Sequence, residues 1–183
     1  NVKNALAAIA AAAKVGVDPA LAAGALGRFE GVRRRLEIRC VVDGITIYDD
    51  FAHHPSAVRA SLSAVRSADS KGRLWALFEP RSATACRRVF QRAFADALKL
   101  ADGVIVGSVF KASLPECDRF SESQLVADLE MAGVRARYIS EFTAIADTVS
   151  KEAKSGDHVV IMSNGDFGGI HEQLMDRLNA ARL

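Results

Sequence analysis

From about residue 55 to its end, the chain alternates short apolar runs with longer amphipathic runs. Short apolar runs are typical of buried strands, and the amphipathic runs have the three-to-four-residue spacing of helices. This alternation predicts parallel strands joined by right-handed helical crossovers. The fold class we expect is α/β, with a doubly wound, mostly parallel, Rossmann-like sheet. The expected strands are 74–78, 104–106, 136–139 and 158–162, and the expected helices are 55–67, about 89–97, 124–131, 142–153 and 169–183.

A β-hairpin is expected to open this sheet. Apolar residues alternate with other residues along 36–42 and again from Ile45 to Ile47, and Asp43-Gly44 lies between the two stretches. Such a dipeptide between two alternating stretches predicts two antiparallel strands with a two-residue turn.

The first 28 residues predict a helical pair that a boundary separates from the rest of the chain. An Ala-rich helix over 1–15 is followed by Asp18-Pro19, a capping residue and a proline that open a second short helix. The pair is too small to bury its own apolar face, and the composition changes at the basic run 33–35. We expect a boundary near Phe29. Because the first residue is Asn1 rather than Met, we also expect that the chain has lost an upstream part.

Charge and composition favour neither nucleic acid nor membrane as a partner. The 24 basic and 22 acidic residues leave a net charge of +2, so no strongly basic surface is indicated. The apolar run Ala5–Ala13 is far shorter than the ~20 residues that span a bilayer. The three cysteines have no metal-binding or disulfide spacing, so a cytoplasmic location is expected.

The chemistry is expected in the loops that follow the strands, because ligands of doubly wound sheets bind outside the carboxyl ends of the strands. Asp49, Asp50, His53 and His54 fall within six residues before a helix that begins at Pro55. They either cap the local structure, bind a metal, or bind a nucleotide or phosphate, and the metal is the weakest of these options.

Three further loops are candidates. They are 79–82, 107–111 and 163–169. Arg81 either binds a carboxylate or phosphate or pairs with Glu79, and the three glycines near Asn164 either admit a ligand or make a tight connection. The sequence lacks both a P-loop and a G-x-G-x-x-G motif, so any ATP phosphates must be held by another domain.

The motifs, in this order, resemble the Mur ligases. Asn1-x-x-Asn4 is followed by Arg34-Arg35-Leu36-Glu37, by YDDFAHHP at 48–55, and by EPRS and SNGDFGGIH in later loops. The resemblance implies that residues 1–28 end a central ATPase domain and that 29–183 form the C-terminal domain of the ligase. It covers nearly the whole chain.

The resemblance also implies site residues. Asn1 and Asn4 match asparagines that contact adenine, Arg35 an arginine that reaches the nucleotide, Asp50 an aspartate that holds the ribose, and His53 a catalytic histidine near the terminal phosphate. His54 either caps the helix or faces the ligand. The residues that match loops facing the amine substrate are Arg81, Ser82, Ser163, Asn164, Gly165 and Asp166.

The implied activity is ATP-dependent amide-bond formation through an acyl phosphate, with Mg²⁺ held mainly by the missing upstream domains. The motifs are most similar to the branch that joins UDP-N-acetylmuramate to the recycled tripeptide L-alanyl-γ-D-glutamyl-meso-diaminopimelate. The partners are these substrates and the rest of the same chain. Rival interpretations are a UDP-N-acetylmuramate–L-alanine ligase, a non-catalytic Rossmann-like binding module, and a metal-dependent hydrolase.

Overall fold

The computed structural model describes residues 2–110 and 114–180 and separates the chain into two units, residues 1–32 and 33–183. The division between Val32 and Arg33 falls a few residues after Phe29, where a boundary was expected.

The first unit is a pair of helices, α1 (Val2–Lys14) and α2 (Pro19–Leu26). As predicted, Asp18 caps α2, and its Oδ1 accepts hydrogen bonds from the backbone N–H groups of Ala20 at 2.8 Å and Leu21 at 3.1 Å. Over the described residues of this unit, neither helix contains a buried side chain. The pair therefore forms no core of its own.

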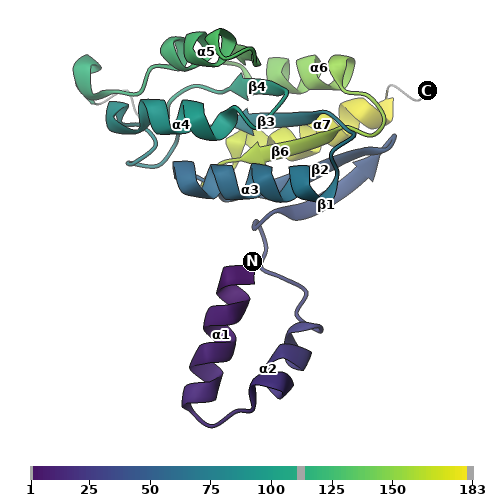
Figure 1. Cartoon of the computed structure of the whole chain (residues 1–183). Helices are drawn as coiled ribbons and strands as arrows, with labels where there is room; N and C mark the ends of the chain where they lie inside the picture. The colour runs from purple at the N-terminus through teal and green to yellow at the C-terminus, as the bar shows by residue number, and fades with distance from the viewer. Residues whose placement is uncertain (1, 111–113, 181–183) are drawn as a thin grey trace. The chain divides into compact units, whose positions relative to one another are not determined.

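The second unit contains a six-stranded sheet with the order β1-β2-β6-β3-β4-β5 (Figure 1). Only the β1–β2 pair is antiparallel, which confirms the predicted doubly wound, mostly parallel sheet and its opening hairpin. Asp43 and Gly44 both have positive φ, as a two-residue hairpin turn requires. The strands are β1 (Glu37–Val42), β2 (Ile45–Asp50), β3 (Leu74–Phe78), β4 (Gly103–Val106), β5 (Arg135–Tyr138) and β6 (His158–Met162).

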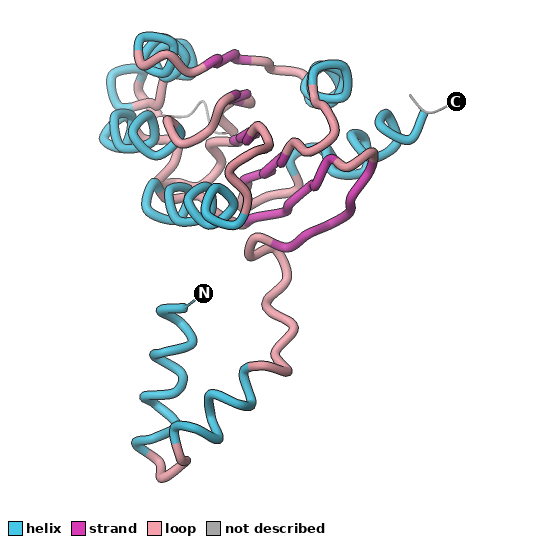
Figure 2. Tube along the Cα trace, turned by 45° about the vertical axis from the view of Figure 1, so that its right-hand side comes forward, coloured by secondary structure: helices cyan, strands magenta, loops and turns pink. Residues whose placement is uncertain are grey.

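Helices cover both faces of the sheet (Figures 1 and 2). One face carries α3 (Pro55–Ala68), α4 (Gln91–Leu98) and α5 (Glu122–Met131), and the other carries α6 (Phe142–Glu152) and α7 (Ile170–Ala180). Short 3₁₀ turns are η1 (Arg88–Phe90), η2 (Glu116–Asp118) and η3 (Phe167–Gly169). No helix within 2–110 or 114–180 is long and apolar enough to cross a membrane.

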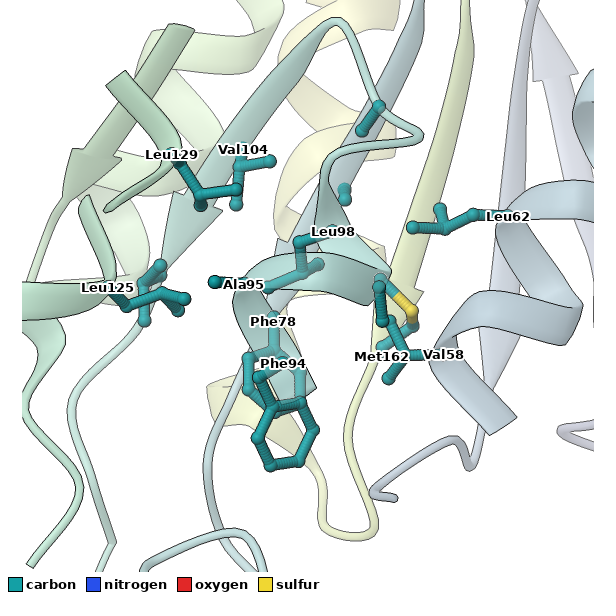
Figure 3. Packing of buried hydrophobic residues seen from close by; sticks show 14 of the residues in the cluster. Val58, Leu62, Phe78, Phe94, Ala95, Leu98, Val104, Leu125, Leu129 and Met162 are labelled. Atoms are coloured by element: carbon teal, nitrogen blue, oxygen red, sulfur yellow. The ribbon is translucent and has the colours of Figure 1, made fainter. Parts of the chain in front are cut away.

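Alternating side chains of the central strands fill two apolar layers. In β3, Leu74, Ala76 and Phe78 pack under α3, α4 and α5, whereas Trp75 and Leu77 pack under α6 and α7. Figure 3 shows the first layer, where Phe78 and Phe94 lie 4.7 Å apart between ring centroids. Because both faces are buried, the central strands are apolar throughout, which is why their sequence positions were predicted well.

Two expected helices differ from the structure at their first turn. The helix expected around 89–97 begins only at Gln91, because Arg88–Phe90 form a 3₁₀ turn after a bridge between Arg87 and Arg119. Val89 is therefore exposed, and Phe90 is only partly buried. The last helix begins at Ile170 after η3, and positions 181–183 lie outside the described residues.

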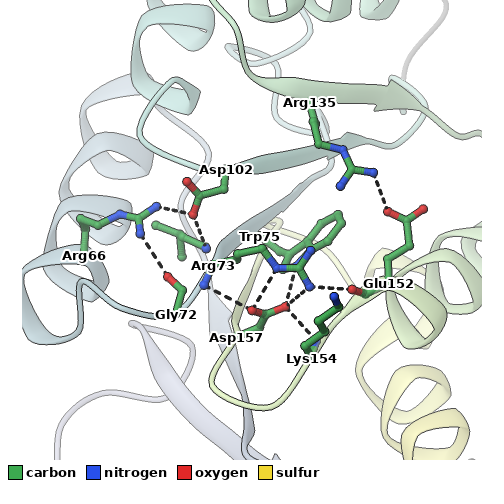
Figure 4. A network of polar contacts seen from close by, with 10 residues as sticks. Arg66, Gly72, Arg73, Trp75, Asp102, Arg135, Glu152, Lys154 and Asp157 are labelled. Atoms are coloured by element: carbon green, nitrogen blue, oxygen red, sulfur yellow. Dashed lines mark hydrogen bonds and ion pairs between the residues drawn. The ribbon is translucent and has the colours of Figure 1, made fainter.

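Hydrogen bonds and ion pairs form a polar network at the amino ends of the parallel strands (Figure 4). Asp157, which precedes β6, accepts hydrogen bonds from the backbone and side chain of Arg73, from the Trp75 indole and from the Lys154 backbone. Asp102, which precedes β4, pairs with Arg66 at 2.6 Å. These contacts join segments far apart in the sequence.

Candidate functional site

The loops after β2, β6 and β3 leave the sheet side by side. Asp50, Met162 and Phe78 are aligned across the three neighbouring strands, so the residues that follow them start in one row. The loop after β4 leaves next to them. The predicted clustering of these loops at one edge of the sheet is thus confirmed, and we call this edge the carboxyl edge.

Glu79 lies at the centre of the carboxyl edge. It is buried, and one carboxylate oxygen accepts a short hydrogen bond from the Ser163 hydroxyl. The other oxygen lies 3.5 Å from the guanidinium of Arg81, the pairing that the sequence left as one alternative for Arg81. Arg81 also stacks on Phe110, with its Cζ 3.7 Å from the ring centroid. Glu79 therefore joins Arg81 to Ser163.

The loop that begins at Ser163 packs under Arg81. The backbone N–H of Gly165 donates to Ser163 Oγ at 2.9 Å. A Cβ atom at Gly165 would lie 2.2–2.6 Å from side-chain atoms of Arg81, so a glycine is required for this close approach. Asn164 Oδ1 is buried without a hydrogen-bond partner, and Asp166 is exposed. The loop thus contains both a buried acceptor and an exposed carboxylate.

Ser82 follows Arg81 but has a local role in the structure. Its hydroxyl accepts a hydrogen bond from the backbone N–H of Ala85 at 2.9 Å, which caps the turn after the loop. The structure brings Arg81, Ser163 and Gly165 together, while Ser82 lies at the start of that turn.

Asp50 is buried beneath the first loop. Its Oδ1 accepts from the backbone N–H of Ala52 at 2.8 Å, and its Oδ2 accepts from the Ser61 hydroxyl at 2.6 Å. Burial raises the pKa of Asp50, although the hydrogen bonds from Ser61 and Ala52 and the positive charge of Arg35 act in the opposite direction. The carboxylate therefore fixes the turn before α3. Its role toward a ribose stays a prediction.

The two histidines of the first loop have different partners. His54 caps α3, since its Nδ1 accepts from the backbone N–H of Ser56 at 3.3 Å, and its ring lies edge-on to Phe90. The capping alternative is thus the one found. His53 Nδ1 lies 2.9 Å from the carbonyl oxygen of Phe51. When Nδ1 donates to that carbonyl, Nε2 of the neutral ring is left as an acceptor.

Phe51 brings Arg35 and His53 together. The guanidinium carbon of the exposed Arg35 lies 5.6 Å from the Phe51 ring centroid, and His53 packs edge-on against the same ring at 5.3 Å. A cationic side chain and an imidazole beside one aromatic ring suit an anionic ligand. Arg35, His53 and Asp50, which the sequence assigned together, are neighbours in the structure.

Arg34 is a site residue that the sequence did not single out. One of its nitrogens, Nη2, donates to the backbone carbonyls of Ser163 at 2.8 Å and Gly165 at 2.6 Å. Its Nε lies 3.4 Å from the buried carboxylate of Asp49. The only signal in the sequence was the run of three arginines, which does not tell which arginine turns inward.

Asp49 lies between two cationic or potentially cationic side chains. His171 Nε2 is 3.4 Å from Asp49 Oδ1, but the contact lacks hydrogen-bond geometry. Burial by itself raises the pKa of Asp49, but His171 and Arg34 together hold that pKa below its ordinary value. The Asp49 carboxylate is thus placed to orient Arg34.

The remaining predicted site residues lie in the first unit. Asn4 is exposed on α1, and Asn1 lies outside the described residues. Neither assignment is tested by the geometry of the sheet.

The described part of the chain has no candidate metal centre, and its two hollows lie away from the carboxyl edge. Within residues 2–110 and 114–180, no group of three His, Cys, Asp or Glu side chains is placed to hold a metal ion. A hollow of about 490 Å³ is lined by α4 and α5, and one of about 570 Å³ lies by the turn of the hairpin. Neither hollow is lined by a residue that the sequence assigned to the site.

Comparison with protein families identifies a match over most of the chain. The family described as "Mur ligase, glutamate ligase domain" matches residues 34–165. This span contains β1 to β6 and the loops after β2, β3 and β4, and it ends at Gly165 within the loop after β6.

Comparison with individual proteins finds relatives that are named as UDP-N-acetylmuramate ligases. The UDP-N-acetylmuramate–L-alanyl-γ-D-glutamyl-meso-2,6-diaminoheptanedioate ligase of Escherichia coli K12 is 44% identical over 97% of this chain and 37% of its own length. The UDP-N-acetylmuramate–L-alanine ligase of Caldicellulosiruptor bescii is 39% identical over 91% of this chain and 36% of its own. A crystal structure of a murein peptide ligase from Psychrobacter arcticus 273-4 superposes with a TM-score of 0.73 and 35% identity, over 97% of this chain and 36% of that one.

Proposed function

This chain belongs to the Mur ligase family, and we propose that it is the C-terminal part of an ATP-dependent ligase that joins UDP-N-acetylmuramate to the tripeptide L-alanyl-γ-D-glutamyl-meso-diaminopimelate. The observation that carries the proposal is the 44% identity to a ligase named for these substrates, which extends over 97% of the chain. The reaction would serve peptidoglycan recycling in the cytoplasm.

The domain assignment is part of the proposal. The chain spans a little over a third of the length of the relatives it matches. We propose that residues 1–28 complete a central ATPase domain and that residues 29–183 are the C-terminal domain. The exposed apolar side chains of the helical pair, such as Leu6 and Leu21, support a larger domain around it.

The nucleotide side of the proposed site is the group around Phe51. Arg35 and His53 would contact phosphate groups, and Asp50 would hold the ribose, with Asn1 and Asn4 near the adenine. The exposed guanidinium and the half-buried imidazole fit the negative charge of a nucleotide. For Asp50, ribose binding requires that a hydroxyl group replace or share the Ser61 contact at 2.6 Å.

Mg²⁺ is proposed to bind outside this chain. The described residues contain no group of three candidate ligands, so they do not fit a complete metal site. The P-loop, which the sequence lacks, would lie with the metal in the upstream domains. The role of this chain would be to neutralise phosphate charge and to exclude water when the domains close.

The amine side of the proposed site is the group around Glu79. In the reaction, the γ-phosphoryl group of ATP passes to the muramate carboxylate, ADP leaves, and the tripeptide amine then attacks the acyl carbon and releases phosphate. Arg81 offers a guanidinium to a peptide carboxylate, and the loop with Asn164 and Asp166 offers acceptors to an amine. The substrate-facing residues in the proposal are Arg81, Ser82, Ser163, Asn164, Gly165 and Asp166.

The test is ADP release by the ligase that contains this chain together with its upstream domains. With UDP-N-acetylmuramate and Mg²⁺ present, we expect rapid turnover with the tripeptide and little with L-alanine. The reverse preference would make the protein an L-alanine ligase, an activity named for the relative that is 39% identical. No turnover with either amine would contradict the proposed reaction.

The 183-residue chain alone is expected to release no ADP. It carries neither a P-loop nor a described metal site, so the phosphates would have no complete binding site. Ligase activity of residues 1–183 by themselves would contradict the domain assignment.

A further inference from the structure

Arg34 joins three separate segments of the second unit through one guanidinium group. Both hydrogen bonds of its Nη2 go to the loop after β6, at the carbonyls of Ser163 and Gly165. Its Nε faces Asp49 near the end of β2. The segment before β1, the end of β2 and the loop after β6 are thereby connected.

The backbone around Arg34 adopts an unusual conformation that directs the Arg34 side chain toward the loop after β6. Arg34 and Leu36 have φ values of 57° and 53°, in the left-handed region that side chains other than glycine rarely adopt. The backbone N–H of Arg34 donates to Glu37 Oε2 at 2.8 Å, and its carbonyl accepts from Phe51 N–H at 2.8 Å. Strained residues persist where their surroundings fix them, and here the result is a guanidinium that points toward the loop.

Asp49 contacts the Arg34 guanidinium at Nε, whereas the two carbonyls contact it at Nη2. Asp49 and His171 are both buried, and Asp49 lies 3.4 Å from each of its two neighbours, Arg34 and His171. A planar guanidinium can donate to two carbonyls and face a carboxylate at the same time, whereas a lysine ammonium is a single point charge. The arrangement therefore requires arginine at this position.

The two carbonyls that Arg34 binds lie on either side of Asn164. The same stretch is held on its other side by Ser163, whose hydroxyl donates to Glu79 and accepts from the Gly165 N–H. We propose that Arg34 is a positioning residue that fixes the loop 163–166 so that Asn164 and Asp166 meet the amine substrate. This inference rests on the proposed function of that loop.

Hydrogen exchange of the 183-residue chain tests the positioning role without any activity. The variant is Arg34→Lys, and the matched control is Arg33→Lys, an exposed arginine of the same run. We expect amide exchange in the peptide that covers 163–166 to become about tenfold faster in Arg34→Lys and to stay unchanged in Arg33→Lys, because two charge-assisted hydrogen bonds lose their geometry. Asp49→Asn should accelerate the same amides by a smaller factor, and it serves as the test if Arg34→Lys does not fold.

Two results would overturn the inference. One is unchanged exchange of the loop 163–166 in the folded variant. The other is faster exchange that spreads evenly over β2, β3 and β6, since Arg34 would then support the whole sheet rather than the loop.

Kinetics of the ligase that contains this chain separate the inference from the function on which it rests. Arg34→Lys is expected to raise the KM for the tripeptide about tenfold and the KM for ATP by a smaller factor, because the Arg34 guanidinium also lies 5.3 Å from the Phe51 ring centroid, and Arg33→Lys should change neither. If the wild-type ligase uses no tripeptide but the loop still exchanges faster, the proposed function fails and the positioning of the loop stands. If the ligase works but the loop and the KM do not change, the positioning role fails alone.

Discussion

The two ends of the parallel strands carry polar clusters of opposite character. At the amino ends, Asp157 accepts five hydrogen bonds, from Arg73, Trp75 and Lys154 (Figure 4). At the carboxyl edge, Arg34 and Ser163 make close hydrogen bonds, whereas Arg81 lies 3.5 Å from Glu79 and stacks on Phe110. The cluster around Asp157 stabilises the fold, whereas the longer contact of Arg81 is consistent with the amine-binding role that we propose for it.

Buried polar atoms that lack a hydrogen-bond partner also distinguish the two ends of the strands. Among the described residues, the buried side-chain polar atoms without a hydrogen bond are Asn164 Oδ1, His171 Nε2 and Gln173 Oε1. They fall in the loop after β6 and the helix α7 that follows it. An unpaired buried polar atom lowers stability, so its presence needs an explanation, and a ligand that pairs with Asn164 is the one that we propose.

Asp157→Ala should have the largest effect on stability. Its removal leaves the Trp75 indole, the Lys154 N–H and the guanidinium of Arg73 without their shared acceptor. We expect the free energy of unfolding, measured with a chemical denaturant, to fall by about 3 kcal/mol, as is typical when one partner of a buried polar network is lost.

A surface pair provides the control for that variant. Asp147 pairs with Arg177 on the surface, and its side chain is half exposed. Asp147→Ala should change the free energy of unfolding by about 0.5 kcal/mol or less. Equal effects of Asp147→Ala and Asp157→Ala would remove the special role of the amino-end network.

Unlike Asp157→Ala, Arg35→Ala should change stability little and the use of ATP strongly. Because Arg35 is exposed, its loss is expected to change the free energy of unfolding by no more than about 0.5 kcal/mol. In the ligase, kcat/KM for ATP should fall roughly tenfold to a hundredfold, as expected for a lost contact with phosphate. A fall in stability with unchanged ATP dependence would place Arg35 outside the nucleotide site.

Asp157 and Asp50 should give opposite pH effects on stability. Burial opposes ionisation of Asp157, but Arg73 and its other donors hold the folded-state pKa below the unfolded value. Its contribution is therefore present above the unfolded pKa and is lost as the pH falls through the folded pKa. Burial raises the pKa of Asp50 in the folded state, so its contribution decreases as the pH rises from the unfolded pKa to the folded pKa.

Acid titrations of unfolding with two variants test these signs. Compared with the wild type, Asp157→Asn should lose less stability on acidification, and Asp50→Asn should lose more. The measurement is the denaturant midpoint as the pH is lowered from 7 through the ordinary carboxyl range of about 4. The same sign for both variants would contradict the assigned environments.

Gly165→Ala should have a small effect on stability and a local effect on the site. The new Cβ would displace the end of the Arg81 side chain, which is flexible, so the free energy of unfolding should change by less than about 1 kcal/mol. The displaced guanidinium should weaken tripeptide binding, seen as a KM for the tripeptide several-fold higher. An unchanged KM would remove Arg81 from the amine side of the site.

The sequence predicted the sheet well because burial on both faces makes its central strands apolar. The strand Leu74–Phe78 and the turn at Asp43-Gly44 were found as expected. The start of α4 was wrong by a few residues, since Val89 and Phe90 have helical spacing but lie in a 3₁₀ turn set by the bridge from Arg87 to Arg119. Local spacing does not report such a long-range contact.

The candidate site was predicted in part. The clustering of the loops follows from the parallel order of the strands, and the resemblance assigned Arg35, Asp50 and His53, which are neighbours in the structure. The inward turn of Arg34 depends on two residues with positive φ, and nothing in the amino-acid types of Arg34 and Leu36 indicates that conformation.

Hydrogen exchange of the ligase with and without its substrates tests the central claim, that the carboxyl edge binds substrate and the amino ends of the strands do not. With ATP, UDP-N-acetylmuramate and the tripeptide present, we expect slower amide exchange in 51–56, 79–82 and 163–166, and no change in 152–158. Protection confined to 152–158, or to the helices α4 and α5 that line the 490 Å³ hollow, would contradict the assignment.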